Sequence, residues 1–417
     1  MIIPSIDLMG GQAVQLIGGK ERAIDAGDPR PIAETFRLAG DIAVIDLDAA
    51  LGQGDNADLI KELVRMAPCR VGGGIRDIET AIRWLDAGAD KIILGTAAKP
   101  EILAELPPER VIAALDAVRG EVVTHGWTTK TGATVEDRMA EIKELVGGFL
   151  VTFVEREGRM EGIDLDAIAR LKEAAGDADL TVAGGFTTPQ DIAAADKLGA
   201  DAQVGMALYS GRLHLADAIA APLTSDRPDG LWPTVVTDEY GVALGLAYSD
   251  LESLRAAVDD RVGAYHSRSR GLWIKGKTSG ATQELLTIDL DCDRDTLRFR
   301  VRQTSPGFCH LNTHTCWGEV GGLPALARLI AARRDSAPEG SYTRRLFTED
   351  GLLDAKLAEE AGELAAATDK GEITHETADL IYFALTAMAR GGVTLDEVEH
   401  ELAQRAKRVT RRPGDRK

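Results

Sequence analysis

The amino-acid sequence predicts a multidomain protein with a (β/α)8 barrel, then a mainly β domain of the α+β class, then an all-α bundle. Over residues 1–221, short apolar runs alternate with amphipathic stretches of helix length, and the pattern repeats internally. After a polar, proline-containing break, polarity alternates from residue to residue, as in half-buried strands. After a second break, apolar residues recur three and four positions apart, as in helices.

The two breaks set the expected domain boundaries. At roughly 150 residues per domain, the 417 residues allow two to three domains. We expect the barrel at 1–221, a linker at 222–230, the mainly β domain at 231–334, a second linker at 335–341 and the helical domain at 342–417.

An internal repeat supports the barrel. Val71-Gly72-Gly73-Gly74-Ile75 recurs as Val182-Ala183-Gly184-Gly185-Phe186, and Gly88-Ala89-Asp90 recurs as Gly199-Ala200-Asp201. Both pairs are separated by 111 residues, which indicates a duplicated half of that size. The alternative is a doubly wound sheet, but nothing resembles the glycine turn of dinucleotide-binding folds.

The elements follow from the same patterns. In the barrel we expect buried parallel strands at 42–47, 70–72 and 91–94, and helices at 78–87 and 165–175. In the second domain we expect strands at 234–237, 242–248 and 297–302. In the third we expect helices at 352–368 and 373–390, and one that begins near Thr394 with Glu397 three residues on.

Composition limits the function. The chain has 48 Lys and Arg against 67 Asp and Glu, a net charge of −19, which argues against general nucleic-acid binding. No apolar run approaches the ~18 residues of a membrane span, and the N-terminus does not resemble a signal peptide. Only 4 cysteines occur, so we expect a reduced, cytoplasmic protein without a disulfide framework. Phosphorylated metabolites can still bind in local pockets.

Glycines at the predicted strand ends suggest two phosphate sites, because such segments expose backbone N–H groups. A ligand with a phosphate at each end would suit the duplicated barrel, although tight packing also selects glycine. Asp7 ends the first strand, where barrel enzymes carry catalytic groups. The expected phosphate-binding residues are Gly73, Gly74, Gly95 and Thr96 in the first half, and Gly184, Gly185 and Gly205 in the second.

The second domain carries a metal-binding pattern. Cys292, Cys309 and Cys316 fall within 25 residues, and three thiolates fit Zn²⁺ with the fourth position left for a water. Zn²⁺ lowers the pKa of that water toward ~7. Asp291, Asp293 and Asp295 alternate along a segment that we expect to be extended, so they would share a face and could bind Mg²⁺. A polar hairpin turn and buried thiols are the alternatives.

One motif in this domain is misleading. Residues 271–278 formally match the phosphate-binding P-loop expression. The stretch contains Leu, Trp and Ile where a P-loop has small residues, and residues 283–292 after it read as a strand instead of a helix. We therefore reject a P-loop, while a loop that contacts a substrate phosphate remains open.

The last domain carries paired carboxylates. Acidic side chains that are three or four residues apart lie on one face of a helix. Two such helices facing each other would form an oxygen cage for Mg²⁺, although solvated surface acids are the alternative. The residues are Glu359, Glu360 and Glu363 on one helix, and Glu376 and Asp379 on the next.

The barrel motifs resemble phosphoribosyl-formimino-AICAR-phosphate isomerase of histidine biosynthesis. They are Ile6-Asp7-Leu8, Val44-Ile45-Asp46-Leu47-Asp48, Val71 to Arg76, Gly95-Thr96-Ala97-Ala98 and Gly126-Trp127. That enzyme converts an aminoaldose to an aminoketose with two carboxyl groups as acid and base. Asp7 matches one, while Glu157 stands where the family has Asp. The longer side chain displaces the carboxylate, and ~1 Å of error can cost ~100-fold in rate.

The second domain resembles phosphoribosyl-AMP cyclohydrolase, which opens the purine ring with a zinc-activated water. The resemblance rests on residues 265–280, Asp291-Cys292-Asp293-Arg294-Asp295 and residues 309–316. It implies Zn²⁺ on the three cysteines, Mg²⁺ on the three aspartates, His310 as the proton-transfer residue, and a homodimer. It implies substrate contacts by Ser267, Arg268, Arg270, Trp273, Lys275, Thr278 and Ser279.

The helical domain resembles phosphoribosyl-ATP pyrophosphohydrolase, one of the all-α nucleotide pyrophosphatases. The matching motifs are Glu359-Glu360-x-x-Glu363, Glu376-x-x-Asp379 and Ser341-Tyr342-Thr343. Such enzymes use Mg²⁺ and a water to cleave between the α- and β-phosphates, and Lys356 would contact a phosphate. The domain order, with residues 337–343 and 409–415, also resembles the first part of the fungal multifunctional histidine enzyme.

The resulting hypothesis is a bifunctional enzyme of histidine biosynthesis. It would hydrolyse phosphoribosyl-ATP and then phosphoribosyl-AMP, and its barrel would be an isomerase whose chemistry is lost or altered. One alternative is a trifunctional enzyme in which Glu157 is competent. Another is a barrel that serves only dimerisation or ligand sensing, and a more distant one is a general nucleotide pyrophosphatase.

Overall fold

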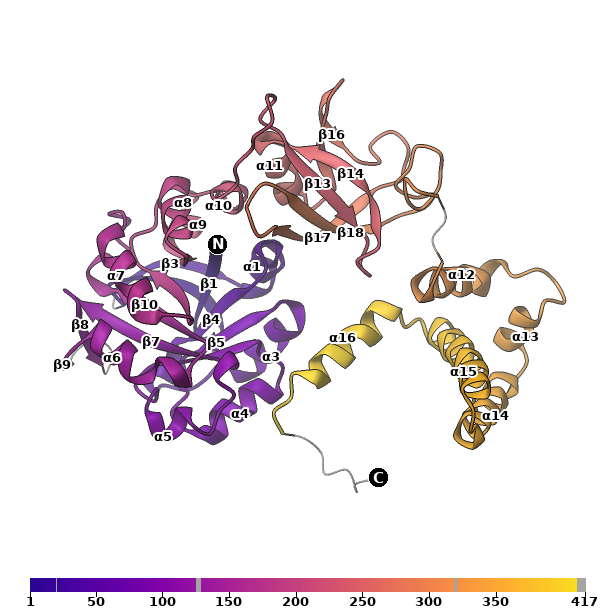
Figure 1. The fold of residues 1–417 in the computed structure, drawn as a ribbon, viewed down its shortest axis with the longest axis horizontal. Helices are drawn as coiled ribbons and strands as arrows, with labels where there is room; N and C mark the ends of the chain where they lie inside the picture. The colour runs from indigo at the N-terminus through magenta and orange to yellow at the C-terminus, as the bar shows by residue number, and fades with distance from the viewer. Residues whose placement is uncertain (20, 125–128, 319–320, 411–417) are drawn as a thin grey trace. The chain divides into compact units, whose positions relative to one another are not determined.

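The computed structural model describes residues 1–19, 21–124, 129–318 and 321–410 (Figure 1). The chain divides into two compact units, Met1–Gly307 with Lys407–Lys417, and Phe308–Ala406. Gly126 and Trp127 of the isomerase-like motifs, and most of the 409–415 motif, lie outside the described residues.

A closed barrel forms the first part of the first unit, as predicted. Among the described residues, eight parallel strands pair in a ring, and the last strand pairs with the first through Ile2 and Ala202. This closure excludes a doubly wound sheet. The strands are β1 (Ile2–Met9), β4 (Ile42–Asp46), β5 (Cys69–Gly72), β6 (Lys91–Leu94), β7 (Val111–Val118), β10 (Gly148–Phe153), β11 (Asp179–Ala183) and β12 (Ala200–Val204).

Helices surround this ring (Figure 1). Side-chain caps begin several of them, for example Asp77 before α4 and Thr188 before α8. They are α1 (Pro29–Phe36), α2 (Leu47–Leu51), α3 (Ala57–Met66), α4 (Ile78–Asp86), α5 (Pro100–Leu103), α6 (Val135–Ile142), α7 (Leu165–Ala175), α8 (Pro189–Lys197), α9 (Met206–Tyr209) and α10 (Leu215–Ala220). The antiparallel strands β2 (Gln12–Ile17), β3 (Glu21–Gly27), β8 (Glu121–Thr124) and β9 (Thr129–Thr134) extend the sheet.

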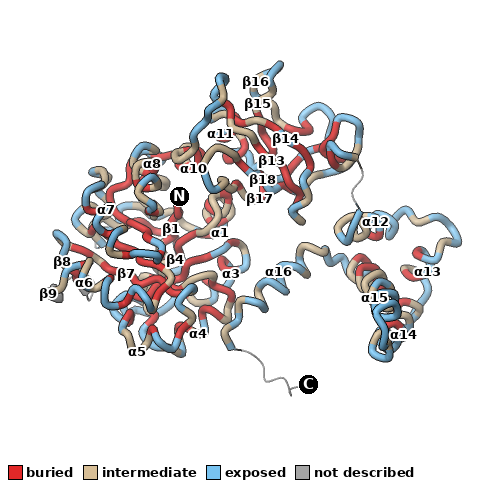
Figure 2. Tube along the Cα trace, in the orientation of Figure 1, coloured by how far each residue is buried: buried red, intermediate tan, exposed pale blue. Residues whose placement is uncertain are grey.

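The barrel interior is packed with side chains. Ile93, Ile112, Leu150 and Ala183 come from four neighbouring strands and form one buried cluster. Figure 2 shows the buried residues following the strands and the exposed ones following the outer helix faces. The barrel is therefore a solid core, and a ligand can be held only at the ends of its strands.

The second part of the first unit is a four-stranded sheet with one helix, α11 (Leu251–Asp260). Its strands, in the order β14-β13-β18-β17, are β14 (Ala243–Ser249), β13 (Trp232–Thr237), β18 (Leu297–Gln303) and β17 (Gln283–Leu290). In β18, buried Leu297, Phe299 and Val301 alternate with exposed arginines, as the sequence pattern predicts. A separate hairpin pairs β15 (Ala264–Ser267) with β16 (Gly271–Ile274).

This hairpin confirms the rejection of a P-loop. Residues 271–274 of that motif form β16, and the next regular element after it is the strand β17. A P-loop needs a helix whose N-terminus points at the phosphate, and that element is not here.

The second unit begins with the loop that carries Cys309 and Cys316 and is helical from Leu323 on. Its helices are α12 (Leu323–Ser336), α13 (Tyr342–Thr348), α14 (Leu352–Ala366), α15 (Lys370–Gly391) and α16 (Leu395–Ala406). Thr394 accepts a hydrogen bond from the N–H of Glu397 (3.2 Å), so the predicted cap of the last helix is present. Among the described residues, no helix is both long enough and apolar enough to span a bilayer.

The place of α12 differs from the prediction, which assigned residues up to 334 to the second domain. Ile330 of α12 is buried with Leu385 and Ala389 of α15, and Leu326 packs against the same cluster. Because these side chains pack against α15, α12 belongs to the helical unit.

Candidate functional site

Two carboxyl groups meet at the carboxyl end of the barrel. Asp7 lies on β1, and Glu157 follows the short helical turn Val154–Arg156 after β10. Burial raises the pKa of Asp7 to about 7. Burial, together with the charges of Asp7 and Asp116, raises the pKa of Glu157 to about 8. The predicted acid–base pair is thus brought together, and its members titrate near neutral pH, as proton-transfer groups need.

The backbone around Glu157 is held by the β2–β3 hairpin. The carbonyl of Glu157 accepts a hydrogen bond from the N–H of Gly18 (3.2 Å). Gly158 has φ +69°, and a Cβ there would lie 2.6 Å from the carbonyl oxygen of Leu16. Only glycine fits this close approach, so Gly158 allows the backbone that carries Glu157 to lie against β2.

The second glycine set lines one small cavity beside Glu157. Gly184, Gly185 and Gly205 surround it together with Phe186. Gly185 has φ +99°, and a Cβ there would lie 2.2 Å from the carbonyl oxygen of Gly162. Tight packing therefore explains this glycine by itself, and phosphate binding by the set stays a prediction.

The first glycine set lies on neighbouring strand ends, because β5 and β6 pair directly. A Cβ on Gly73 would lie 2.2 Å from the carbonyl oxygen of Asp46, and one on Gly74 would lie 2.5 Å from the Cβ of Ala49. At Gly95, which precedes Thr96, a Cβ would meet nothing within 4 Å. Gly95 is the position of this set where space for a ligand remains.

Sequence reasoning missed Tyr209 at the same end of the barrel. Its ring packs edge-on against Phe36 at 5.6 Å. Among the described residues its hydroxyl is buried without a hydrogen-bond partner, and burial with the charge of Asp7 raises its pKa. The sequence signal that could have found Tyr209 is its position four residues after Gly205, the glycine that follows β12.

In the second domain, the three aspartates are brought together by a turn between β17 and β18, and not by an extended segment as predicted. One ligand oxygen from each of Asp291, Asp293 and Asp295 lies within 4.8 Å of the others. Oδ1 of Asp291 accepts the N–H groups of Asp295 (3.0 Å) and Thr296 (3.1 Å). Burial opposes the charged form of Asp291, but these backbone donors outweigh it and lower its pKa. Three carboxylates so close suit a hard divalent cation.

Cys309 and Cys316 lie together in the second unit. The pKa of the Cys309 thiol is lowered by the N–H of Leu311, the Thr313 hydroxyl and the Cys316 thiol. The N–H of Leu311 lies 3.5 Å from the sulfur, and Nδ1 of His310 lies 3.9 Å from it. A stabilised thiolate beside a second thiol fits Zn²⁺. Cys292 belongs to the first unit, and its part in the same site stays a prediction.

The predicted substrate residues of this domain lie on and after the β15–β16 hairpin. Ser267 ends β15, and the guanidinium of Arg270 lies 5.5 Å from the ring centre of Trp273 in β16. Arg268 stacks over Tyr248 at 5.9 Å. Thr278 and Ser279 are exposed after the hairpin.

Lys275 is placed differently from the others. It is buried, and its ammonium donates to the carbonyls of Ala281 (3.2 Å) and Gly307 (3.4 Å). These bonds tie two loops together and give Lys275 a structural role.

In the helical unit, Glu360, Glu363 and Glu376 form one cluster. One carboxylate oxygen from each lies within 4.8 Å of the others, across α14 and α15. Burial and the neighbouring Glu363 raise the pKa of Glu376, and its Oε2 is buried with no hydrogen-bond partner among the described residues. A buried, unsatisfied carboxylate oxygen beside two others fits a bound Mg²⁺.

Glu359 and Asp379 lie at the edge of this cluster. The ammonium of Lys356 pairs with Glu359 (2.8 Å) and Glu360 (3.0 Å), and these carboxylates raise its pKa. Asp379 pairs with His375 at 3.5 Å. Their predicted metal contacts remain predictions, while Lys356 is held as a cation one turn from Glu360.

This combination defines a multidomain metabolic protein: an (β/α)8 barrel with an acid–base pair, a small sheet with metal-type ligands, and a helical unit with an acidic cluster. Three family models match the chain in that order. They are a histidine biosynthesis protein (residues 1–214), phosphoribosyl-AMP cyclohydrolase (245–318) and phosphoribosyl-ATP pyrophosphohydrolase (323–406). The chain belongs to the histidine biosynthesis protein family, and it carries a cyclohydrolase and a pyrophosphohydrolase domain.

Curated relatives agree with this assignment. A histidine biosynthesis trifunctional protein of Neurospora crassa is 38% identical over 359 residues, 82% of this chain and 38% of that protein. One from Komagataella pastoris is 52% identical over 206 residues, 49% of this chain and 24% of that protein. An isomerase of Natronomonas pharaonis, named for its imidazole-4-carboxamide substrate, is 40% identical over 233 residues, 52% of this chain and 97% of that protein. The chain thus spans about a quarter to two fifths of the trifunctional relatives.

Proposed function

We propose that this chain hydrolyses phosphoribosyl-ATP to phosphoribosyl-AMP and pyrophosphate, and then opens the purine ring of phosphoribosyl-AMP. The order of the two matching domain families supports this pair of activities. The observation that carries the proposal is the three-carboxylate cluster with its unsatisfied Oε2 of Glu376, because it supplies the oxygen ligands that pyrophosphate release requires.

In the first reaction, the residues of the helical unit mainly bind and position. Glu360, Glu363 and Glu376 would hold Mg²⁺, which neutralises charge on the pyrophosphate leaving group when bound. The ammonium of Lys356 stays protonated beside Glu359 and Glu360, so it can contact a substrate phosphate without taking part in proton transfer.

In the second reaction, Cys309 and Cys316 would hold Zn²⁺ together with Cys292. Bound Zn²⁺ lowers the pKa of a coordinated water and so supplies hydroxide near neutral pH. His310, whose ring lies beside the Cys309 sulfur, would move the proton. The three turn aspartates would hold Mg²⁺ for the substrate phosphate. As the resemblance implies, we propose that this domain works as a homodimer.

The barrel supports a second candidate function, the aminoaldose–aminoketose isomerisation. Near pH 7, Glu157 with a pKa of about 8 keeps its proton, while Asp7 with a pKa of about 7 is partly ionised. Glu157 would therefore donate a proton to the ring oxygen of the sugar, and Asp7 would remove the proton from the adjacent carbon. This favours a working barrel over one that has lost its chemistry.

The test is to supply each substrate separately to the purified full chain. Phosphoribosyl-ATP should give pyrophosphate, phosphoribosyl-AMP should give the ring-opened aminoaldose, and the aminoaldose should give the aminoketose. Comparable turnover of ordinary ATP would instead support a general nucleotide pyrophosphatase.

A further inference from the structure

The turn that carries the three aspartates is bonded to the barrel through Arg294. Nε of Arg294 donates to Oδ2 of Asp196 (3.3 Å), and Nη2 donates to Oδ1 of the same carboxylate (3.2 Å). The remaining nitrogen, Nη1, donates to the carbonyl of Asp291 (2.8 Å). One side chain therefore links a carboxylate at the end of barrel helix α8 to the first aspartate of the turn.

The backbone of Arg294 is held as well. Its φ is +63°, a left-handed conformation that residues with a Cβ seldom adopt. Its carbonyl accepts hydrogen bonds from the N–H (2.7 Å) and the hydroxyl (3.3 Å) of Thr224. A residue in this conformation between Asp293 and Asp295 sets the directions of both neighbouring carboxylates, so whatever holds Arg294 also orients the ligands.

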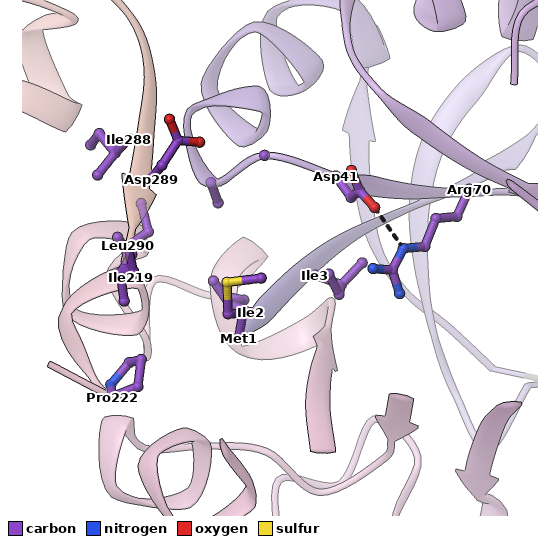
Figure 3. Close-up of a pocket in the computed structure, with 12 residues that line it drawn as sticks. Met1, Ile2, Ile3, Asp41, Arg70, Ile219, Pro222, Ile288, Asp289 and Leu290 are labelled. Atoms are coloured by element: carbon purple, nitrogen blue, oxygen red, sulfur yellow. Dashed lines mark hydrogen bonds and ion pairs between the residues drawn. The ribbon is translucent and has the colours of Figure 1, made fainter. Parts of the chain in front are cut away.

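Asp196 lies on the barrel face opposite the acid–base pair. Burial opposes its charged form, but the guanidinium of Arg294 and the N-terminal ammonium together outweigh burial and lower the pKa of Asp196. The amino group of Met1 donates to the same carboxylate (3.0 Å). Next to this contact, a cavity of about 250 Å³ is lined by Met1, Ile2 and Arg70 of the barrel and by Ile288, Asp289 and Leu290 of β17 (Figure 3).

We propose that Asp196 of the barrel is a positioning residue for the cation site of the cyclohydrolase domain. By holding Arg294, it keeps Asp291, Asp293 and Asp295 in the arrangement in which their oxygens converge. The inference rests on the proposed binding of Mg²⁺ at this turn. It gives the barrel a role in the neighbouring hydrolase that is independent of any isomerase activity.

A second ion pair across the same boundary provides a matched control. The guanidinium of Arg255 on α11 donates to both oxygens of Asp217 on α10, each at 2.7 Å. This pair also joins the barrel to the sheet domain through two parallel bonds. Its member in the sheet domain, Arg255, lies on α11 and not on the aspartate turn. Loss of Asp217 therefore weakens the contact between the barrel and the sheet domain without removing a bond to the aspartate turn.

The experiment measures Mn²⁺ binding to the full chain by electron paramagnetic resonance. All proteins carry Glu363→Gln, so that the helical cluster does not contribute, and Zn²⁺ is kept saturating. Asp196→Ala should weaken Mn²⁺ binding by about 10-fold or more, the scale expected for a residue that orients metal ligands. Asp217→Ala should change it by no more than about twofold. In a protein that already carries Arg294→Gln, Asp196→Ala should have no further effect, because its partner is gone.

Three results would overturn the proposal. If Asp196→Ala binds Mn²⁺ as tightly as the parent, or if both single variants weaken it equally, Asp196 does not position the ligands. If Asp293→Asn leaves binding in the parent unchanged, the cation does not sit on this turn, and the proposed cation site falls with the inference. Should Asp196→Ala not fold, Asp196→Asn keeps one acceptor without the charge, and it should give a smaller weakening in the same direction.

Discussion

Burial and the charge of Asp7 on β1 raise the pKa of Glu157, which follows β10 in the second half of the barrel. Each half of the barrel thus contributes one carboxyl group to a single site. Burial raises the pKa of Asp7 to about 7, and burial with the charges of Asp7 and Asp116 raises that of Glu157 to about 8. Near neutral pH, such a pair can include one protonated carboxyl group that donates a proton and one ionised carboxylate that accepts a proton.

We expect the isomerase rate to be bell-shaped in pH, with its maximum between about 7 and 8. Below this range Asp7 is protonated and cannot accept a proton, and above it Glu157 has lost the proton that it donates. Initial rates of aminoketose formation from pH 5.5 to 9.5 measure the profile.

Glu157→Gln should lower that rate by at least about 100-fold, because an amide cannot donate the proton. Glu157→Asp is the matched variant that keeps the carboxyl group. Activity in Glu157→Asp but not in the parent would show a decayed enzyme. Activity in neither protein would contradict a catalytic barrel.

Glu157 should also make the stability of the barrel depend on pH. Its folded pKa of about 8 lies above the ordinary value of 4.5, so the folded state holds a proton that the unfolded chain releases. The stabilisation from this proton is complete below about pH 4.5 and is lost as pH rises to about 8.

Glu157→Gln removes this titration, and at pH 8.5 we expect it to raise the free energy of unfolding by on the order of 2 kcal/mol. At pH 4.5 the difference should be small. Calorimetric unfolding at the two pH values measures it. An equal effect at both would mean that the substitution acts through packing alone.

The helical cluster should be required for pyrophosphate release only. Glu363→Gln replaces one of the three converging carboxylates by a neutral amide, and we expect it to slow pyrophosphate release by at least about 100-fold, as a misplaced reacting group does. Ring opening of supplied phosphoribosyl-AMP should continue at the parental rate. Glu401→Gln on α16 is the control, because Glu401 lies outside the three-carboxylate cluster and pairs with Arg405 (2.8 Å) on its own helix. Equal loss in both variants would contradict a specific metal role.

Removal of zinc should have the reverse effect. A chelator that strips Zn²⁺, or Cys309→Ser, should abolish ring opening and leave pyrophosphate release intact. Cys69→Ala is the matched control, because Cys69 is buried in β5 and burial raises the pKa of its thiol. Zinc content per chain, measured by atomic absorption, should fall in Cys309→Ser and stay unchanged in Cys69→Ala. Unchanged zinc in Cys309→Ser would refute the ligand assignment.

Sequence patterns predicted the regular elements well where one periodicity dominated. Helix α7 matches its expected bounds, and β18 shows the expected alternation, because each buries one continuous apolar face. The pattern failed at α12, whose apolar face is covered by α15 instead of by the sheet that precedes it. Which neighbour covers a helix depends on contacts distant in sequence, and these have no local signature.

The site residues also divide into those whose position could be predicted from the sequence and those whose position could not. Asp7 and the helical glutamates were predictable because their spacing fixes them to a strand end or a helix face. The arrangement of Asp291, Asp293 and Asp295 was not, because alternation suggested an extended segment, whereas the left-handed Arg294 makes a turn. That conformation is held by Asp196 and Thr224, which lie far away in the sequence.

The most direct test gives the purified chain phosphoribosyl-ATP with Mg²⁺ and Zn²⁺, and separates the products by mass-resolved chromatography with retention standards for the two isomers. Our account predicts release of pyrophosphate, ring opening of phosphoribosyl-AMP, and conversion of the resulting aminoaldose to the aminoketose. Absence of pyrophosphate release from a folded, metal-loaded chain would contradict the central claim that both hydrolases work in this protein.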